Sequence, residues 1–227
     1  MPEISTDQWK SLQERINTCP DCLSQNLLQH SACLPDRPWP PQKTGRTLLI
    51  SEAPPASGGF WQVKIEDDLR KNLKVFLRLS LTNTQESCLE NFMARGFFLL
   101  QTIKWPIAPR PNAKSLNFNQ LGSAQQRTLI NHTATTHLKA EIEILAPSRI
   151  LAMGNAAWRA CQILSPITLK DKPTGVEMVR QQPLKFLMSQ ETIPLHVTLL
   201  PLKQNLRFPE KKELIQKDFE EFLDEVP

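Results

Sequence analysis

The sequence predicts an α/β fold in which a parallel β-sheet is covered by helices on both faces. Four short runs are predominantly apolar, at residues 47–51, 97–101, 149–153 and 195–200. Segments with the helical spacing of apolar residues separate them. Apolar strands that alternate with helices are typical of buried parallel sheets. We therefore expect a three-layer α/β/α sandwich with a central four-stranded parallel sheet.

The helices are predicted from the 3.6-residue period and from stop signals. A first amphipathic helix is expected over 5–17, ahead of a loop rich in cysteine and proline, and later helices over 66–79, 85–95, 124–145 and 209–224. Gly96 and Pro147 follow two of these segments as stop signals, and another helix is expected after Gly154. Between 165 and 194 the pattern is irregular, with a weak strand signal near Phe186.

Length and composition limit the number of domains and the type of protein that the sequence can encode. With 227 residues, the chain is long enough for one α/β domain and short for two, so we expect a single domain, 1–227, with an N-terminal part over 1–45 and a core over 46–227. The net charge of +4 permits a polyanionic partner without requiring one. No run has the length of a membrane span and the first residues lack a signal-peptide pattern, which favours the cytoplasm and no membrane partner. Five cysteines, an odd number, argue against a disulfide framework.

The candidate site residues follow the predicted strands. In parallel sheets, ligands bind beyond the carboxyl ends of the strands. The segments that leave these ends are 51–61, 101–110, 154–157 and 201–207. The first segment holds the carboxylate of Glu52 in a turn with two prolines.

Four motifs follow one another along the chain: a Cys-x-x-Cys pair at 19–22, Ser-Glu-Ala-Pro-Pro at 51–55, a strand end with a loop at 100–106, and a Leu-x-Pro block at 145–154. In this order they resemble the uracil-DNA glycosylase superfamily, especially the branch that carries an iron–sulfur cluster. The stretch 51–55 is similar to the family's Gly-Glu-(Ala/Gly)-Pro-Gly. The stretch 100–106 is similar to a strand end followed by a Lys-x-x-Pro-like loop. The block at 145–154 is similar to the family's Leu-x-Pro block that ends in Ala-Leu-Gly. The resemblance extends over residues 19–222 and implies the glycosylase fold.

The chain also departs from the family pattern. Gln101 stands where the family has asparagine, and Trp105 stands where a third cluster cysteine is expected. No cysteine lies near 134–136, where the fourth is expected. The segment 201–207 replaces a His-Pro-Ser type motif. The resemblance therefore implies a divergent member without an intact four-iron cluster.

Glu52 is the candidate catalytic residue. Hydrolysis of an N-glycosidic bond passes through a cation-like state, which a carboxylate can stabilise while it orients the attacking water. The resemblance assigns this role to Glu52 and places Ala53 and Pro54 against the substrate. The pattern alone favours the alternative, in which Glu52 is a solvated turn carboxylate or a helix-capping acid; the resemblance favours the site role.

Two further residues are candidates for contact with the base. The resemblance places Phe60 as the ring that stacks on a base flipped out of the duplex, and the alternative is core packing. Gln101 offers a donor and an acceptor to a pyrimidine edge, although it is as readable as a polar residue that ends a strand.

Basic and polar residues at the strand ends are candidates for DNA contacts. Those expected at phosphates are Lys104, Gly154, Asn155 and Arg207, the middle two because they open a helix. Those expected to replace the missing histidine near the leaving base are Lys203, Gln204 and Asn205. The alternatives are a tight turn at Gly154 and a solvated basic loop over 203–207.

The cysteines suggest a metal site close to the N-terminus. No cofactor is expected for the protein as a whole; if a metal does bind, the expectation is zinc in a compact site of Cys19, Cys22, His30 and Cys33. Cys88 and Cys161 lie on predicted helices and are expected to be buried thiols. His132 and His137 are five residues apart on a predicted helix, so they are expected on its surface without sharing a face.

These features lead to two hypotheses of different classes. The first is an enzyme that hydrolyses the N-glycosidic bond of uracil or another damaged base in DNA. The second is a glycosylase-like module with little or no catalysis that binds nucleic acid or a protein; an enzyme for another nucleotide-like substrate is a weaker third. The expected partner is single-stranded or uracil-containing DNA, and the expected state is a monomer.

Overall fold

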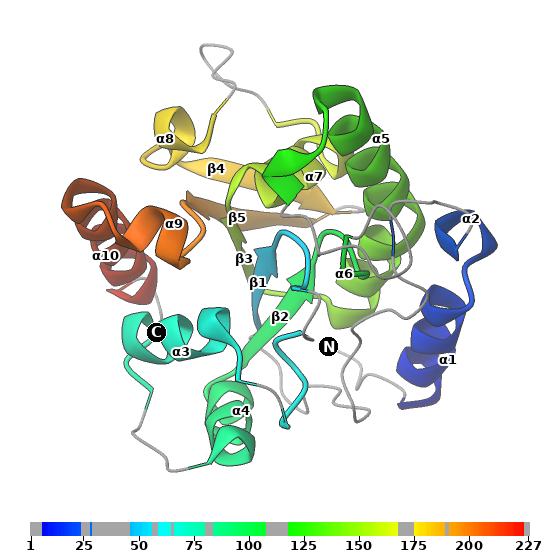
Figure 1. Ribbon diagram of the computed structural model, residues 1–227, viewed down its shortest axis with the longest axis horizontal. Coiled ribbons are helices and arrows are strands. Elements are labelled where there is room, and N and C mark those ends of the chain that lie inside the picture. Colours follow the sequence, from blue (N-terminus) through cyan, green and yellow to red (C-terminus); the bar gives the residue numbers. More distant parts are fainter. Residues whose placement is uncertain are drawn as a thin grey trace.

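The computed structural model describes residues 6–23, 28, 46–55, 59–64, 66–79, 84–107, 118–167, 175–188 and 191–224. Its centre is a five-stranded mixed sheet with the strand order β2-β1-β3-β5-β4 (Figure 1). The strands are β1 (Thr47–Ser51), β2 (Phe97–Gln101), β3 (Arg149–Met153), β4 (Leu184–Met188) and β5 (Glu191–Thr198). The expected α/β class is confirmed.

The four predicted strands are parallel to one another. β1 lies between β2 and β3, with Ser51 opposite Gln101 and Ile50 opposite Ala152. β3 pairs in turn with β5, with Met153 opposite Thr198. The carboxyl ends of β1, β2, β3 and β5 therefore meet at one edge of the sheet, as the sequence predicts, although β5 begins and ends earlier than 195–200.

The expectation of a purely parallel four-stranded sheet is wrong in one respect. β4 pairs antiparallel with β5 and forms the edge of the sheet. Its side chains alternate, because Leu184 and Phe186 are buried whereas Lys185 is exposed. A short strand with one solvated face gives a much weaker apolar signal than the central strands.

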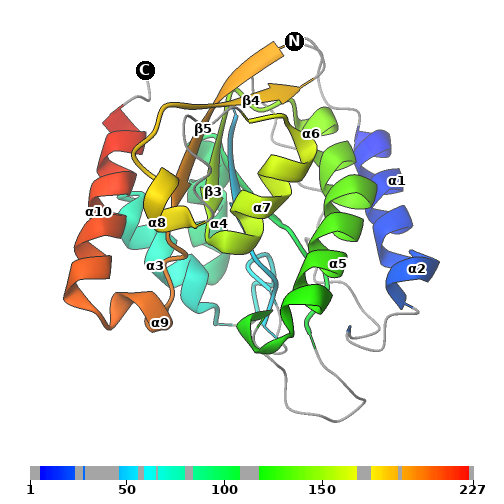
Figure 2. The same cartoon turned by 90° about the horizontal axis from the view of Figure 1, so that it is seen from above.

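Helices lie on both sides of the sheet (Figure 2). One side carries α3 (Asp68–Phe76) and α10 (Pro209–Asp224), and the other carries α5 (Ser123–Thr133) and α7 (Asn155–Leu164). The remaining α-helices are α1 (Thr6–Asn17), α2 (Pro20–Leu23), α4 (Gln85–Ala94), α6 (Lys139–Leu145), α8 (Val176–Val179) and α9 (Lys203–Leu206). Within the described ranges, no helix combines the length and the apolar character needed to span a bilayer.

The helix predicted over 124–145 is interrupted by a π-helical segment, η2 (Ala134–Leu138), between α5 and α6. The N–H of Lys139 donates to the carbonyl of Ala134, five residues back. Before this point, the hydroxyls of Thr133 and Thr135 donate to the carbonyls four residues earlier, each at 2.8 Å. Threonines that bond back in this way disturb a regular helix, and the π segment changes which residues share a face.

Candidate active site

A cavity of about 250 Å³ opens beyond the carboxyl ends of the strands. Ser51 and Glu52 contribute to its wall from the end of β1, and Gln101 contributes from the end of β2. The loop after β1, the start of α3, the 3₁₀ turn η1 (Phe118–Gln120) and the segment after β5 complete the lining. The structure thus brings together segments from three predicted strand ends.

Gly154 fixes the end of β3 against the end of β5. Its φ angle is 89°, and an added Cβ would lie 3.2 Å from the Cβ of Leu200, which lines the cavity. Its N–H donates to the carbonyl of Thr198 at 2.8 Å. The side chain of Asn155 is also engaged, because its Oδ1 accepts from the N–H of Val176 at 3.2 Å. The Gly154 N–H is therefore engaged within the turn, whereas the phosphate contact expected at the exposed Asn155 stays a prediction.

The backbone beneath Glu52 is held by hydrogen bonds that continue past the ends of β1 and β2. The carbonyl of Glu52 accepts from the N–H of Ile103, and that of Ser51 accepts from the N–H of Thr102, both at 2.9 Å. The hydroxyl of Thr102 adds a second bond to the Ser51 carbonyl at 2.8 Å. Pro54 then fixes φ in the turn. The Glu52 carboxylate therefore projects from a rigid base into the cavity.

Glu52 differs from the other carboxylates of the lining. Burial raises the pKa of Glu52 to about 7. Glu66 is paired with Lys71 at 2.7 Å, and Asp67 caps α3 by accepting from the N–H of Arg70 at 2.7 Å. Within the described ranges, the Glu52 carboxylate has neither a hydrogen bond nor an ion pair. It is thus a carboxylate poised to exchange a proton near neutral pH.

Because of this pKa, Glu52→Gln is expected to stabilise the fold at alkaline pH. The pKa lies at about 7 in the folded state and near its ordinary value of 4.5 in the unfolded chain. The folded state therefore binds more protons in this window, and the stability of the native protein falls as pH rises through it. The penalty reaches at most about 3 kcal/mol above pH 7. Urea unfolding should show the variant more stable at pH 8 and equal to the native protein at pH 4; equal stability at pH 8 would contradict the raised pKa.

Two polar side chains accompany Glu52 in the lining. The hydroxyl of Ser51 is buried, with 2% of the residue exposed, and its Oγ has no hydrogen-bond partner among the described residues. Gln101 is also buried. Sequence reasoning placed Gln101 at the site and overlooked Ser51, although Ser51 directly precedes Glu52. A serine hydroxyl and a glutamine amide supply donors and acceptors for a polar ring.

Phe60 lies in the aromatic core, which corrects its expected stacking role. It is buried, and its ring packs edge-on against Trp61 and Phe92 at centroid distances of 5.2 and 5.1 Å. The aromatic residue that does line the cavity is Phe118. Nothing in the local sequence connects Phe118 with the strand ends, because tertiary folding brings it there.

Lys104 is inside the protein, so its predicted contact with DNA phosphate is wrong. Only 2% of the residue is exposed, and its Nζ forms an ion pair with Glu141 of α6 and donates to the carbonyl of Gln101. Burial lowers the pKa of Lys104 and raises that of Glu141, and each charge acts on the other in the opposite direction. Lys104 therefore anchors the main chain of Gln101 from behind the cavity.

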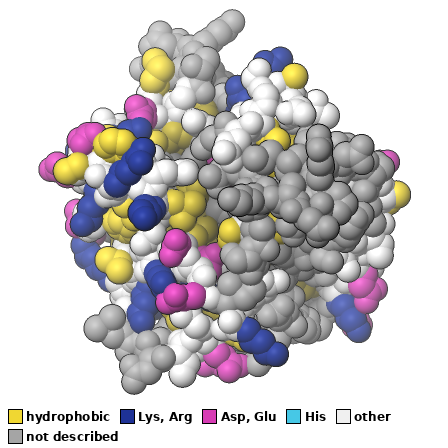
Figure 3. Space-filling view, in the orientation of Figure 1, with side chains coloured by type: hydrophobic (Ala, Val, Ile, Leu, Met, Phe, Trp, Pro, Cys, Tyr) yellow, Lys and Arg dark blue, Asp and Glu magenta, His cyan; other side chains and the backbone are white. Residues whose placement is uncertain are grey.

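The residues of α9 and its C-cap, Arg207, differ in their positions: some line the cavity or support its wall, and others are exposed beside it. Gln204 lines the cavity, whereas the amide of Asn205 donates to the carbonyl of Leu200 at 2.8 Å and braces the loop. Lys203 and Arg207 are exposed. On the face shown in Figure 3, basic side chains over α9 and α10 lie next to acidic side chains over the start of α3. An anionic ligand would therefore approach from the α9 side.

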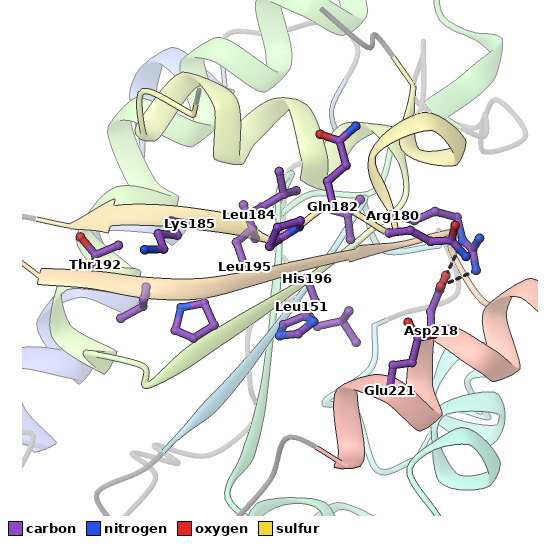
Figure 4. Close-up of a pocket in the computed structure, with 15 residues that line it drawn as sticks. Leu151, Arg180, Gln182, Leu184, Lys185, Thr192, Leu195, His196, Asp218 and Glu221 are labelled. Carbon is purple, nitrogen blue, oxygen red and sulfur yellow. Dashed lines mark hydrogen bonds and ion pairs between the residues drawn. The ribbon is translucent and has the colours of Figure 1, made fainter. Parts of the chain in front are cut away.

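A larger cavity, of about 480 Å³, lies on the sheet face between the β4–β5 hairpin and α10 (Figure 4). Arg180 and Asp218 form an ion pair in its wall, and Asp218 also accepts from the hydroxyl of Thr198 at 2.7 Å. These charged groups are satisfied within the fold. Because this cavity is away from the converging strand ends, we take the smaller cavity with Glu52 as the candidate active site.

The structure changes the expected environment of the cysteines. Cys19 and Cys22 are buried and lie beside His132 and His137. The other two predicted metal ligands, His30 and Cys33, fall outside the described residues. The expectation that His137 is a surface residue is wrong, because only 4% of it is exposed. Burial of Cys88 and Cys161 is confirmed.

Comparison with known proteins adds no assignment to this geometry. The chain matches no protein-family model and no curated protein sequence. The cavity, its lining residues and the order of the motifs along the chain are the features that bear on function.

Proposed function

We propose that the cavity around Glu52 hydrolyses the N-glycosidic bond of a base in DNA, with uracil as the first candidate. One observation carries the proposal: a carboxylate with a pKa of about 7 projects from the end of β1 into a polar cavity at the carboxyl edge of the sheet. A general base is most effective when its pKa lies near the working pH. The motif resemblance to the uracil-DNA glycosylase superfamily supports the same chemistry and a glycosylase-type fold.

The lining supports a single base as the group that enters. The cavity of about 250 Å³ is smaller than the range of about 300–1,000 Å³ that is typical of sites for drug-sized ligands. A base inside a duplex would have to be extruded to reach it. The amides of Gln101 and Gln204 would recognise the edge of the base, while ionised Glu52 would activate water and stabilise the cation-like sugar.

A second function, that of a binding module, is favoured by the missing imidazole. No histidine is among the described residues that line the cavity. A departing pyrimidine anion would therefore be stabilised by the neutral amides of the lining and by lysine or arginine outside it, which is less specific than a positioned imidazole. A chain that retains the fold and the basic rim but lacks catalysis would bind single-stranded DNA.

The proposal is tested by base release from oligonucleotides. The purified protein is incubated with single- and double-stranded oligonucleotides that contain uracil, hypoxanthine or xanthine, and abasic sites are revealed by alkaline cleavage. We expect cleavage at one of these bases with the native protein and much slower cleavage with Glu52→Gln. If the native protein leaves all three bases intact and still binds DNA, the binding module replaces the enzyme.

DNA binding itself is expected to depend on the basic residues of α9. Lys203→Ala and Arg207→Ala should each weaken binding to single-stranded DNA, because each removes a charge that can release counterions from a phosphate. The slope of log affinity against log salt should fall by about 0.7 per lost contact. Fluorescence anisotropy over a salt series measures both quantities. The matched control is Lys185→Ala, which removes an exposed lysine on β4. Equal affinities for all three variants would refute the proposed contacts of Lys203 and Arg207 with DNA.

A further inference from the structure

Four metal-binding side chains gather where the N-terminal helices meet the α5–η2–α6 helix. They are Cys19, Cys22, His132 and His137, and their ligand atoms all lie within 4.8 Å of one another. The Sγ of Cys22 and the Nε2 of His137 are 3.3 Å apart. The two cysteines flank the start of α2, and the two histidines come from α5 and η2, so residues more than 100 positions apart form one cluster.

We propose that these four side chains bind one Zn²⁺ ion in a tetrahedral Cys₂His₂ site. Zinc takes four nitrogen and sulfur ligands in structural sites, with Zn–S bonds of about 2.3 Å and Zn–N bonds of about 2.0 Å. Tetrahedral angles then separate a sulfur and a nitrogen ligand by about 3.5 Å. The 3.3 Å between Cys22 and His137, and the 4.8 Å limit for the whole set, agree with ligands that share a single ion.

One polar atom of the cluster has no hydrogen-bond partner within the described part of the protein. The Nε2 of His132 is buried and has no hydrogen-bond partner among the described residues. Cys22 is fully buried, and His137 is nearly so. An unsatisfied buried nitrogen costs free energy unless a ligand engages it. Two thiolates would neutralise the charge of Zn²⁺, so that the filled site adds no net charge to the interior.

The π-helical segment explains how two histidines five residues apart reach the same ion. In a regular α-helix, five residues turn the chain by about 500°, which leaves the two side chains about 140° apart. In the π segment, the backbone bonds join residues five positions apart, so His132 and His137 come onto one face. Their rings stand edge to face, with centroids 6.2 Å apart. π segments are frequent at functional sites.

The same residues do not fit the four-iron cluster of the family that the motifs resemble. Such a cluster is held by four cysteine thiolates, whereas this site supplies two. Trp105 occupies the position of a further cysteine, and its ring packs 5.6 Å from that of His137. With four protein ligands the zinc site is closed to substrate, which is typical of a structural ion. The ion would fasten α1 and α2 to the helical layer.

Metal content and spectroscopy of the full-length native protein test the proposal directly. We expect about one zinc per chain by elemental analysis and an X-ray absorption spectrum with two sulfur and two nitrogen neighbours. Replacement by Co²⁺ should give the visible bands of a tetrahedral ion with thiolate ligands. Two results would contradict the zinc site. One is bound iron with broad visible absorption, and the other is protein that contains no metal after purification in the presence of zinc.

Variants distinguish this ligand set from the alternative with His30 and Cys33. Cys22→Ser and His132→Gln should each lose most of the bound zinc. The matched controls Cys88→Ser, another buried cysteine, and His196→Gln, another half-buried histidine, should keep it. If His30→Gln releases the metal and His132→Gln retains it, the proposed set is wrong. None of these readouts depends on glycosylase activity.

Discussion

Replacing Glu52 by glutamine is expected to lower the rate of base release by about 10²–10⁴-fold, the range for loss of a general acid–base group. Glutamine keeps the shape of the side chain and removes its ability to take a proton from water. It also removes the negative charge that stabilises the cation-like sugar. The measurement is the single-turnover rate at pH 8, where Glu52 is ionised because its pKa is about 7.

The pH dependence gives a second readout of the same residue. The native rate should fall as pH drops through about 7, since protonated Glu52 cannot act as a base. The residual rate of Glu52→Gln should lack this step. Glu66→Gln is the matched control, because Glu66 also lines the cavity but is exposed and paired with Lys71. A native rate that is independent of pH between 5 and 9, or an equal loss in Glu66→Gln, would contradict the role of Glu52.

The second large effect is expected at the buried ion pair behind the cavity. Lys104→Met should destabilise the fold by about 3–5 kcal/mol, because it leaves the Glu141 carboxylate buried without its cation. The side chains of Lys104 and Glu141 are 3% and 2% exposed, so water cannot replace the lost partner. Urea or thermal unfolding of the purified variant measures the loss.

Two comparisons make this prediction specific to the pair. Lys104→Met combined with Glu141→Leu should recover most of the lost stability, because no unpaired charge remains. Lys139→Met is the matched control, since Lys139 and Glu143 form an exposed pair one turn apart on α6. Its cost should be about 0.5 kcal/mol or less. Equal costs for the two single lysine variants would show that Lys104 is not an internal ion-pair partner.

The central strands and most helix boundaries could be predicted from the sequence because their signals are local. A continuous apolar run such as 97–100 indicates a buried strand from local sequence alone. The C-terminal helix has the limits that its pattern predicts, Pro209 to Asp224. Even the position of Glu52 follows locally, because a residue that ends a parallel strand must lie at the carboxyl edge of the sheet.

Tertiary structure decided the residues whose roles depend on distant partners. The sequence cannot distinguish a basic residue at a rim from one inside the fold, and Lys104 is internal because Glu141 is placed to neutralise it. Phe60 and Phe118 are both aromatic residues near predicted loops. In the folded protein, Phe60 packs in the aromatic core, whereas Phe118 lines the cavity.

The cluster of two cysteines and two histidines shows the same limit most clearly. The Cys-x-x-Cys motif marks Cys19 and Cys22 as candidate ligands, and the structure places both beside His132 and His137, while metal binding by them stays a prediction. Their neighbours His132 and His137 were misplaced because the spacing rule assumes a regular α-helix. The sequence determined an α/β sheet with Glu52 at its carboxyl edge. Only the tertiary structure, through a π-helical turn and the docking of α1 and α2, decided which histidines face the cysteines.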